Sequence, residues 1–185
     1  MDSSHLYFQA PVYNASFDSA VQGGDAVWEG LRGRNSPQFL DYKIHHNNLL
    51  NNILAKIQAT VAGVDAAVML DLMGFVAELH DTNLIMIKDG VVMTPQPDGC
   101  LRGITRGLVI DICGRLRLPL QERNLSLSEF YTADEVFASG TMGELTPVIE
   151  IDGRQIIDRT GKKITKQIQD HFKTLIPQLS EPLSF

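Results

Sequence analysis

The sequence has few cysteines and no clustered positive charge, and both absences narrow the possible functions. Cys100 and Cys113 are the two cysteines among 185 residues, and they form neither a Cys-x-x-Cys pair nor part of a His/Cys cluster. This usage fits a reducing compartment and argues against a metal site. The formal charge of −6 and the lack of a Lys/Arg cluster argue against a nucleic-acid partner.

Long apolar runs are also lacking. The longest stretches, such as 66–70 and 84–87, have the length of a strand and fall far short of a bilayer crossing. The first residues carry neither the features of a signal peptide nor the Arg-rich character of a transit peptide. We therefore expect a soluble protein of the cytoplasm or an organelle matrix, without a membrane partner.

The composition that remains is typical of a globular protein with one main core, since 44% of the residues are hydrophobic and 21% are charged. A chain of this length buries about 70% of the surface that its unfolded form exposes, so it needs no disulfide or metal for stability.

Apolar residues recur at helical spacing between Asn47 and Ala62, and Gly63 follows as a natural C-cap. This pattern predicts a helix. Short runs rich in branched residues come next and predict an antiparallel meander, at 66–71, 75–78, 83–88 and 91–94.

A second helix is predicted at 105–116, with Thr105 as its candidate N-cap. Two further strands, 135–139 and 146–151, are separated by the loop 140–144, and a final helix is expected near 161–175. The predicted fold class is therefore α+β.

Several segments resemble one known family, in the family's order and with near-family spacing. They are LDYKIHHNNLLNNILAKIQA, GFVAE, TNL, KDG, TPQPDGCLRGITR, ADEVFASGTMGELTPV and IDGR. Together they resemble the large domain of fold-type-IV pyridoxal-phosphate enzymes, and specifically branched-chain-aminotransferase-like proteins, from about Ser36 to Leu175. The segment FDSAVQGGDAVWEGLR resembles the family's N-terminal part. The resemblance implies two regions, a remnant of the small N-terminal domain at 1–33 and a cofactor-binding large domain at 34–185.

The resemblance implies that Lys43 is the catalytic lysine that bonds to pyridoxal 5'-phosphate. Covalent attachment needs a neutral amine, which a partly buried lysine beside a cationic cofactor supplies. The same amine would then carry a proton between the substrate and the cofactor. The alternative is that Lys43 is an exposed lysine before a helix, and Lys56 is a poorer candidate because it lies within that helix.

Glu78 matches the family's glutamate that pairs with the pyridine nitrogen of the cofactor, where a carboxylate keeps that nitrogen protonated. The chain departs from the family just after this residue. The family usually continues this motif as a Thr-Asn-Ala sequence, whereas this chain has Leu79-His80-Asp81 before Thr82 and Asn83. The alternative for Glu78 is a strand-end carboxylate that points to solvent.

The resemblance assigns the cofactor's phosphate to two loops. The turn at Ile104 and Thr105 opens a helix, whose free amides and dipole favour an anion. The loop with Thr141 and Met142 would supply further donors. Asn47 or Asn48 occupies the region where relatives place a tyrosine near the cofactor, and Asn48 is the candidate that we retain.

Trp28 and Arg32 resemble the edge of the family's substrate pocket, and the fork of Arg32 suits a carboxylate. His45 and His46 lie next to each other without an evident third ligand, so no metal is expected.

Arg32 and Arg34 are almost adjacent here, whereas the family inserts most of a small domain between the corresponding segments. The resemblance therefore implies a large internal deletion. Three functions remain open: an aminotransferase that moves an amino group from an amino acid to a 2-oxo acid, a lyase related to aminodeoxychorismate lyase, and an inactive shortened relative. Relatives are usually dimers, so the resemblance also implies a homodimer.

Overall fold

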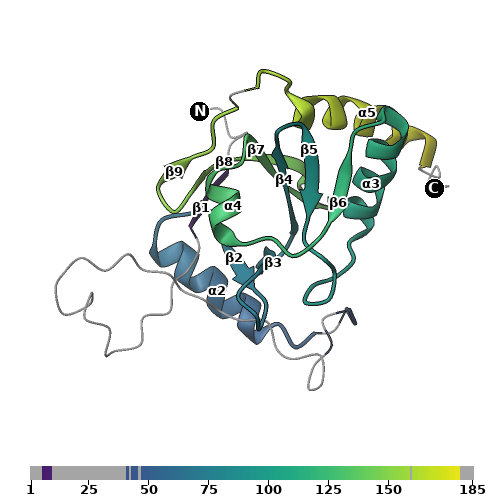
Figure 1. The fold of residues 1–185 in the computed structure, drawn as a ribbon. Coiled ribbons are helices and arrows are strands. Elements are labelled where there is room, and N and C mark those ends of the chain that lie inside the picture. Colours follow the sequence, from purple (N-terminus) through teal and green to yellow (C-terminus); the bar gives the residue numbers. More distant parts are fainter. Residues whose placement is uncertain (1–5, 10–40, 42, 46, 159, 180–185) are drawn as a thin grey trace.

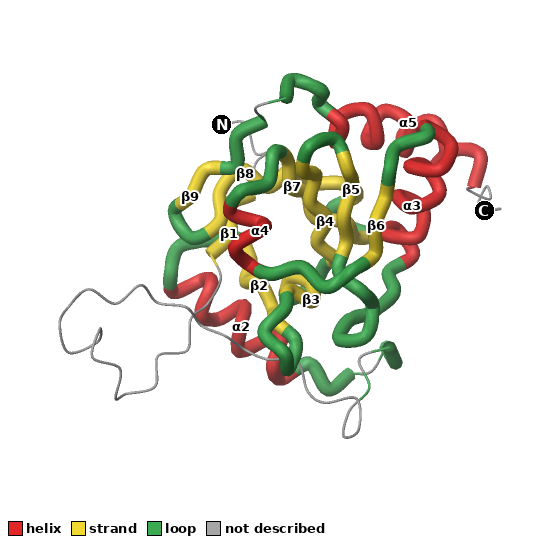
Figure 2. Tube along the Cα trace, in the orientation of Figure 1, coloured by secondary structure: helices red, strands yellow, loops and turns green. Residues whose placement is uncertain are grey.

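The computed structural model describes residues 6–9, 41, 43–45, 47–158 and 160–179, which form an α+β fold (Figures 1 and 2). The predicted fold class is thus confirmed. In this part of the chain, nine strands form one mixed sheet. Helices α3 and α5 lie together beside β4, β5 and β6, and α2 lies beside β2 at the opposite end of the sheet (Figure 1).

The strands follow the order β3-β2-β1-β8-β7-β4-β5-β6, and β9 pairs with β8. Their bounds are β1 Leu6–Gln9, β2 Ala66–Leu70, β3 Val76–Leu79, β4 Asn83–Lys88, β5 Val91–Thr94, β6 Leu120–Glu122, β7 Glu135–Gly140, β8 Glu144–Ile151 and β9 Arg154–Gln155. Strand β1 is parallel to both of its neighbours, and β5 is parallel to β6. The remaining pairs are antiparallel.

The predicted continuous meander is wrong in one respect, because β3 does not pair with β4. Strand β4 is instead held between β5 and β7, which is far away in sequence. Hairpin patterns report only on neighbouring segments, whereas a buried strand needs hydrogen-bonding partners for the backbone groups along both of its edges. Strands β1 and β6 were not predicted.

Three of the helices correspond to predicted ones: α2 (Leu50–Val61), α3 (Ile104–Leu116) and α5 (Ile164–Leu179). Thr105 is not the N-cap of α3. Gly103 takes that position, with a φ of 70° that disfavours other residues. The short helix α4 (Leu127–Tyr131) was missed, although a Ser126/Glu129 capping box marks its start. Hydrogen bonding to Arg123 lowers the pKa of Glu129.

Alternation along β7 divides the core between the two faces of the sheet. Phe137 packs with apolar residues of α3 and α5, whereas Val136 and Ala138 face the opposite cluster, which includes Phe130 of α4. Both cysteines are buried, and burial raises the pKa of Cys113 to about 11. Its thiol is therefore protonated and unreactive near neutral pH.

The outward face of α2 is apolar and exposed. Leu50, Ile53, Ile57 and Val61 recur along this face, and Val61 is 85% exposed. The inner face packs Ala55 and Ala59 on β2. Among the helices that the structure describes, none combines the length and the apolar character that a membrane crossing demands.

Candidate functional site

A pocket of about 480 Å³ lies where the carboxyl end of β7 meets the β3–β4 turn and the start of α3. Its walls come from segments that are distant in sequence. The lining residues are His45, Glu78, Asp81, Thr82, Asn83, Leu101, Arg102, Gly103, Ile104, Thr105, Ser139, Gly140 and Thr141. Polar and small residues predominate in this set, which is suited to a polar ligand.

Glu78 is the buried carboxylate of this pocket, with only 5% of its surface exposed. Asn83 fixes its position, because Asn83 Nδ2 donates to Glu78 Oε2 over 3.1 Å and to the Leu101 carbonyl over 3.0 Å. The alternative in which Glu78 points to solvent is therefore wrong. A buried, hydrogen-bonded carboxylate in a pocket is a strong candidate for holding a cationic or protonated ligand atom.

The N-terminus of α3 forms a second part of the pocket. Gly103 is its N-cap, and no side chain of the described residues caps the helix. The first amides of an α-helix have no partner within the helix, so this end can accept an anion. A Cβ atom at Gly103 would lie 1.9 Å from Asn83 Oδ1, which shows how closely the helix start approaches Asn83.

Ser139 supplies an unpaired hydroxyl to the same space. The residue is 2% exposed, and its Oγ has no hydrogen-bond partner within the described structure. The backbone at the end of β7 is closely packed as well, since a Cβ atom at Gly140 would lie 2.6 Å from Thr82 Cγ2. Buried polar atoms are rarely left unpaired, and this one indicates a ligand position.

The structure brings four of the predicted cofactor residues together, since Glu78, Ile104, Thr105 and Thr141 all line the pocket. Asn48 and Met142 are exposed and do not line it. Trp28 and Arg32 lie outside the described residues. The roles assigned to all of these residues stay predictions.

Lys43 is exposed and does not line the pocket. Its Nζ lies 3.4 Å from Asp98 Oδ1, in an ion pair on the surface. His45 follows two residues later and does reach the pocket, so the segment that carries Lys43 runs along the rim. The catalytic role of Lys43 stays a prediction.

The predicted site residues did not include Asn83, Arg102 or His45. Ser139 was not singled out either, although it begins the loop with Thr141 and Met142 that was predicted to bind the phosphate. Asn83 carried a usable signal, because a polar residue that begins a fully buried strand needs a buried partner. Arg102 carried one as well, since it directly precedes the predicted phosphate turn.

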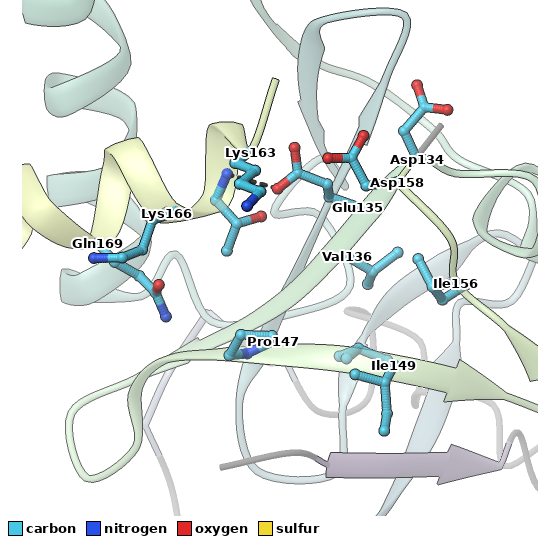
Figure 3. A pocket seen from close by; sticks show the side chains of 12 residues that line it. Asp134, Glu135, Val136, Pro147, Ile149, Ile156, Asp158, Lys163, Lys166 and Gln169 are labelled. Carbon is cyan, nitrogen blue, oxygen red and sulfur yellow. Dashed lines mark hydrogen bonds between the residues drawn. The ribbon is translucent and has the colours of Figure 1, made fainter. Parts of the chain in front are cut away.

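A second pocket, of about 500 Å³, lies at the opposite end of β7 (Figure 3). Its carboxylates have structural partners. Glu135 accepts hydrogen bonds from the Ile164 and Thr165 amides at the start of α5, over 2.7 and 2.8 Å. Asp134 accepts one from the Asp89 amide, and Asp158 accepts three within its own loop. The pocket that contains Glu78 is therefore the better candidate for chemistry.

No group of three or more His, Cys, Asp or Glu residues is arranged to hold a metal ion within the ranges that the structure describes.

Comparison with protein families identifies relatives of the chain. The family described as Amino-transferase class IV matches residues 19–151. Branched-chain-amino-acid aminotransferase-like protein 2 of Arabidopsis thaliana is 47% identical over 176 residues, which are 95% of this chain and 30% of that protein. A putative branched-chain-amino-acid aminotransferase of Methanocaldococcus jannaschii is 45% identical over 129 residues, which are 69% of this chain and 45% of that protein.

Solved structures of the same kind share the fold. The branched-chain aminotransferase of Thermoproteus uzoniensis with norvaline has a TM-score of 0.79 at 32% identity, over 98% of this chain and 54% of that one. The branched-chain amino acid aminotransferase of Thermobaculum terrenum in its PLP-form has a TM-score of 0.76 at 27% identity, over 95% of this chain and 52% of that one. The chain thus spans about a third to a half of the length of these relatives. From its sequence and its fold alike, it belongs to the class IV aminotransferase family.

Proposed function

We propose that this protein binds pyridoxal 5'-phosphate and is an aminotransferase of the branched-chain type, which moves an amino group from an amino acid to a 2-oxo acid. One observation carries the proposal. A buried glutamate, an uncapped helix N-terminus and an unpaired buried hydroxyl surround a single pocket.

The residues of this pocket fit the two polar ends of the cofactor. Glu78 is a buried acceptor for a protonated pyridine nitrogen. The start of α3 and the Ser139 hydroxyl are donors for a phosphate, which needs several hydrogen bonds in a small space. Thr105 and Thr141 add hydroxyl groups to the same lining.

When bound, pyridoxal phosphate supplies a carbonyl group that amines attack and a pyridine ring that accepts electrons. The Glu78 carboxylate holds a proton at the pyridine nitrogen, and Asn83 keeps that carboxylate in place through the 3.1 Å hydrogen bond. Burial of both side chains excludes water from this contact and strengthens it.

Lys43 moves a proton at the α-carbon of the amino acid. Its present partner does not prevent that role, because Asp98 is 77% exposed and a surface ion pair contributes only about 0–1 kcal/mol. The role requires a change of side-chain rotamer that releases Lys43 from Asp98. The family relationship also supports a homodimer and the division into a small-domain remnant at 1–33 and a cofactor-binding domain at 34–185.

The test is an absorbance titration of the purified protein with pyridoxal phosphate, followed by borohydride reduction and peptide mass spectrometry. We expect a reduced adduct on Lys43 in the unmodified protein and no such adduct in Lys43→Ala. Leucine or valine should convert the cofactor to its amine form in the unmodified protein, detected by product analysis, and should not do so in Lys43→Ala.

Lys56→Ala is the matched control, since Lys56 is an exposed lysine on α2 that donates to the Asp65 carbonyl. This variant should keep the adduct and the response to amino acids. Equal labelling of Lys43 and Lys56 would show nonspecific reaction and reject the proposal. Release of pyruvate without an amino acceptor would instead identify a lyase.

A further inference from the structure

The pocket that contains Glu78 has an uneven distribution of charge. Glu78 and Asp81 contribute carboxylates on the side of the β3–β4 turn. Among the described lining residues, Arg102 is the one side chain with a permanent positive charge, and it directly precedes the Gly103 N-cap of α3. Arg102 therefore lies at the end of the pocket where the helix amides begin.

Two arginines flank the start of α3, and they differ in their partners. Arg106 is 4% exposed and pairs with Glu122 over 2.6 Å, while its Nε donates to Thr94 Oγ1. Arg102 is exposed, and within the described residues no ion pair holds its guanidinium. Arg106 thus anchors the helix to the sheet, and Arg102 stays available to a ligand.

A phosphate monoester has a charge of about −1.5 to −2 near neutral pH, whereas a helix N-terminus offers only about half a positive charge. Hydroxyl donors such as Ser139 add hydrogen bonds and no charge. A guanidinium supplies a full charge and two parallel donors, a geometry that matches phosphate.

We propose that Arg102 binds the phosphate group of pyridoxal phosphate and supplies the positive charge that the amides and hydroxyls of this pocket lack. The inference rests on the proposed function, because it takes that cofactor as the ligand. In this proposal Arg102 binds the ligand, whereas Arg106 stabilises the fold through Glu122 and Thr94.

The test compares pyridoxal phosphate with pyridoxal, which lacks the phosphate, by measuring both dissociation constants for the full chain. Arg102→Gln should weaken the binding of pyridoxal phosphate roughly tenfold, the effect of losing a charge-assisted contact, and leave pyridoxal unchanged. Arg102→Lys keeps the charge and loses the fork, so its loss should be smaller.

Arg115→Gln is the matched control, because Arg115 lies in the last turn of the same helix and the substitution changes the net charge equally. It should alter neither dissociation constant. Equal weakening of both ligands by Arg102→Gln, or weakening of neither, would overturn the role of Arg102. Inorganic phosphate that bound as tightly as pyridoxal phosphate would overturn the assignment of this site to the cofactor.

Failure of the proposed function gives a different result. In that case the unmodified protein would bind pyridoxal phosphate no better than pyridoxal and would form no adduct on Lys43, and both proposals would fall.

Discussion

The two ends of strand β7 show how the same kind of structure serves two purposes. At one end, Glu135 places its carboxylate on the amides that begin α5 (Figure 3). At the other end, Ser139 faces a pocket beside the start of α3, which has no side-chain cap among the described residues. The two residues lie on the same face of β7 and are roughly 13 Å apart along the strand.

The difference lies in what satisfies each helix N-terminus. The Glu135 carboxylate accepts hydrogen bonds from the first amides of α5, so this end of β7 has a structural role. No described side chain caps the start of α3, so this end is open to an external anion. An unpaired hydroxyl lies in each pocket, that of Ser139 beside α3 and that of Thr165 beside α5. A helix end that lacks its own cap is a better marker of a binding site than pocket volume, because the two pockets measure about 480 and 500 Å³.

The largest loss of stability should come from a substitution at Gly103, where the start of α3 lies very close to Asn83. Gly103→Ala places a Cβ atom 1.9 Å from Asn83 Oδ1, at a φ of 70° that alanine rarely adopts. We expect a loss of roughly 3 kcal/mol in the free energy of unfolding, measured by urea denaturation, together with the loss of pyridoxal phosphate binding.

Gly107→Ala is the control for that variant, since its Cβ atom meets nothing within 4 Å on the same helix. It should stabilise the protein by about 0.5–1 kcal/mol. A loss below about 1 kcal/mol for Gly103→Ala would mean that the helix start relaxes easily, and the tight approach would then have no importance.

A smaller loss of stability is expected when the Glu135 carboxylate at the start of α5 is removed. Glu135→Ala removes the acceptor for two amides and should lower the free energy of unfolding by about 2 kcal/mol, while Glu135→Gln should lose less. Neither change should alter the affinity for pyridoxal phosphate, because Glu135 lies at the far end of β7. A loss of affinity without a loss of stability would contradict the structural role of this end.

The smallest change in stability is expected from removing either of two unpaired hydroxyls. Comparing the two variants also tests which end of β7 binds the ligand. Ser139 Oγ and Thr165 Oγ1 are both buried without a partner within the described residues. Ser139→Ala and Thr165→Val should each change the free energy of unfolding by less than about 1 kcal/mol, because no hydrogen bond is lost. Only Ser139→Ala should weaken pyridoxal phosphate binding in a titration. Equal binding by both variants would remove Ser139 from the ligand site.

Much of the candidate site could be predicted from the sequence. The residues Glu78, Ile104, Thr105 and Thr141 were selected from their motifs, and all four line one pocket. Asn83 and Arg102 carried local signals, but those signals did not specify their roles. Their importance depends on the 3.1 Å contact with Glu78 and on the place of Arg102 in the lining, and neither follows from local sequence.

The sequence by itself determined the local elements and the family, because helical spacing, strand alternation and motif order are properties of neighbouring residues. Tertiary structure alone decided that β4 pairs with β7, that Glu135 caps α5 and that α3 begins uncapped beside Ser139. Those features join residues that are far apart in the chain. They form only when burial of both sheet faces brings the segments together.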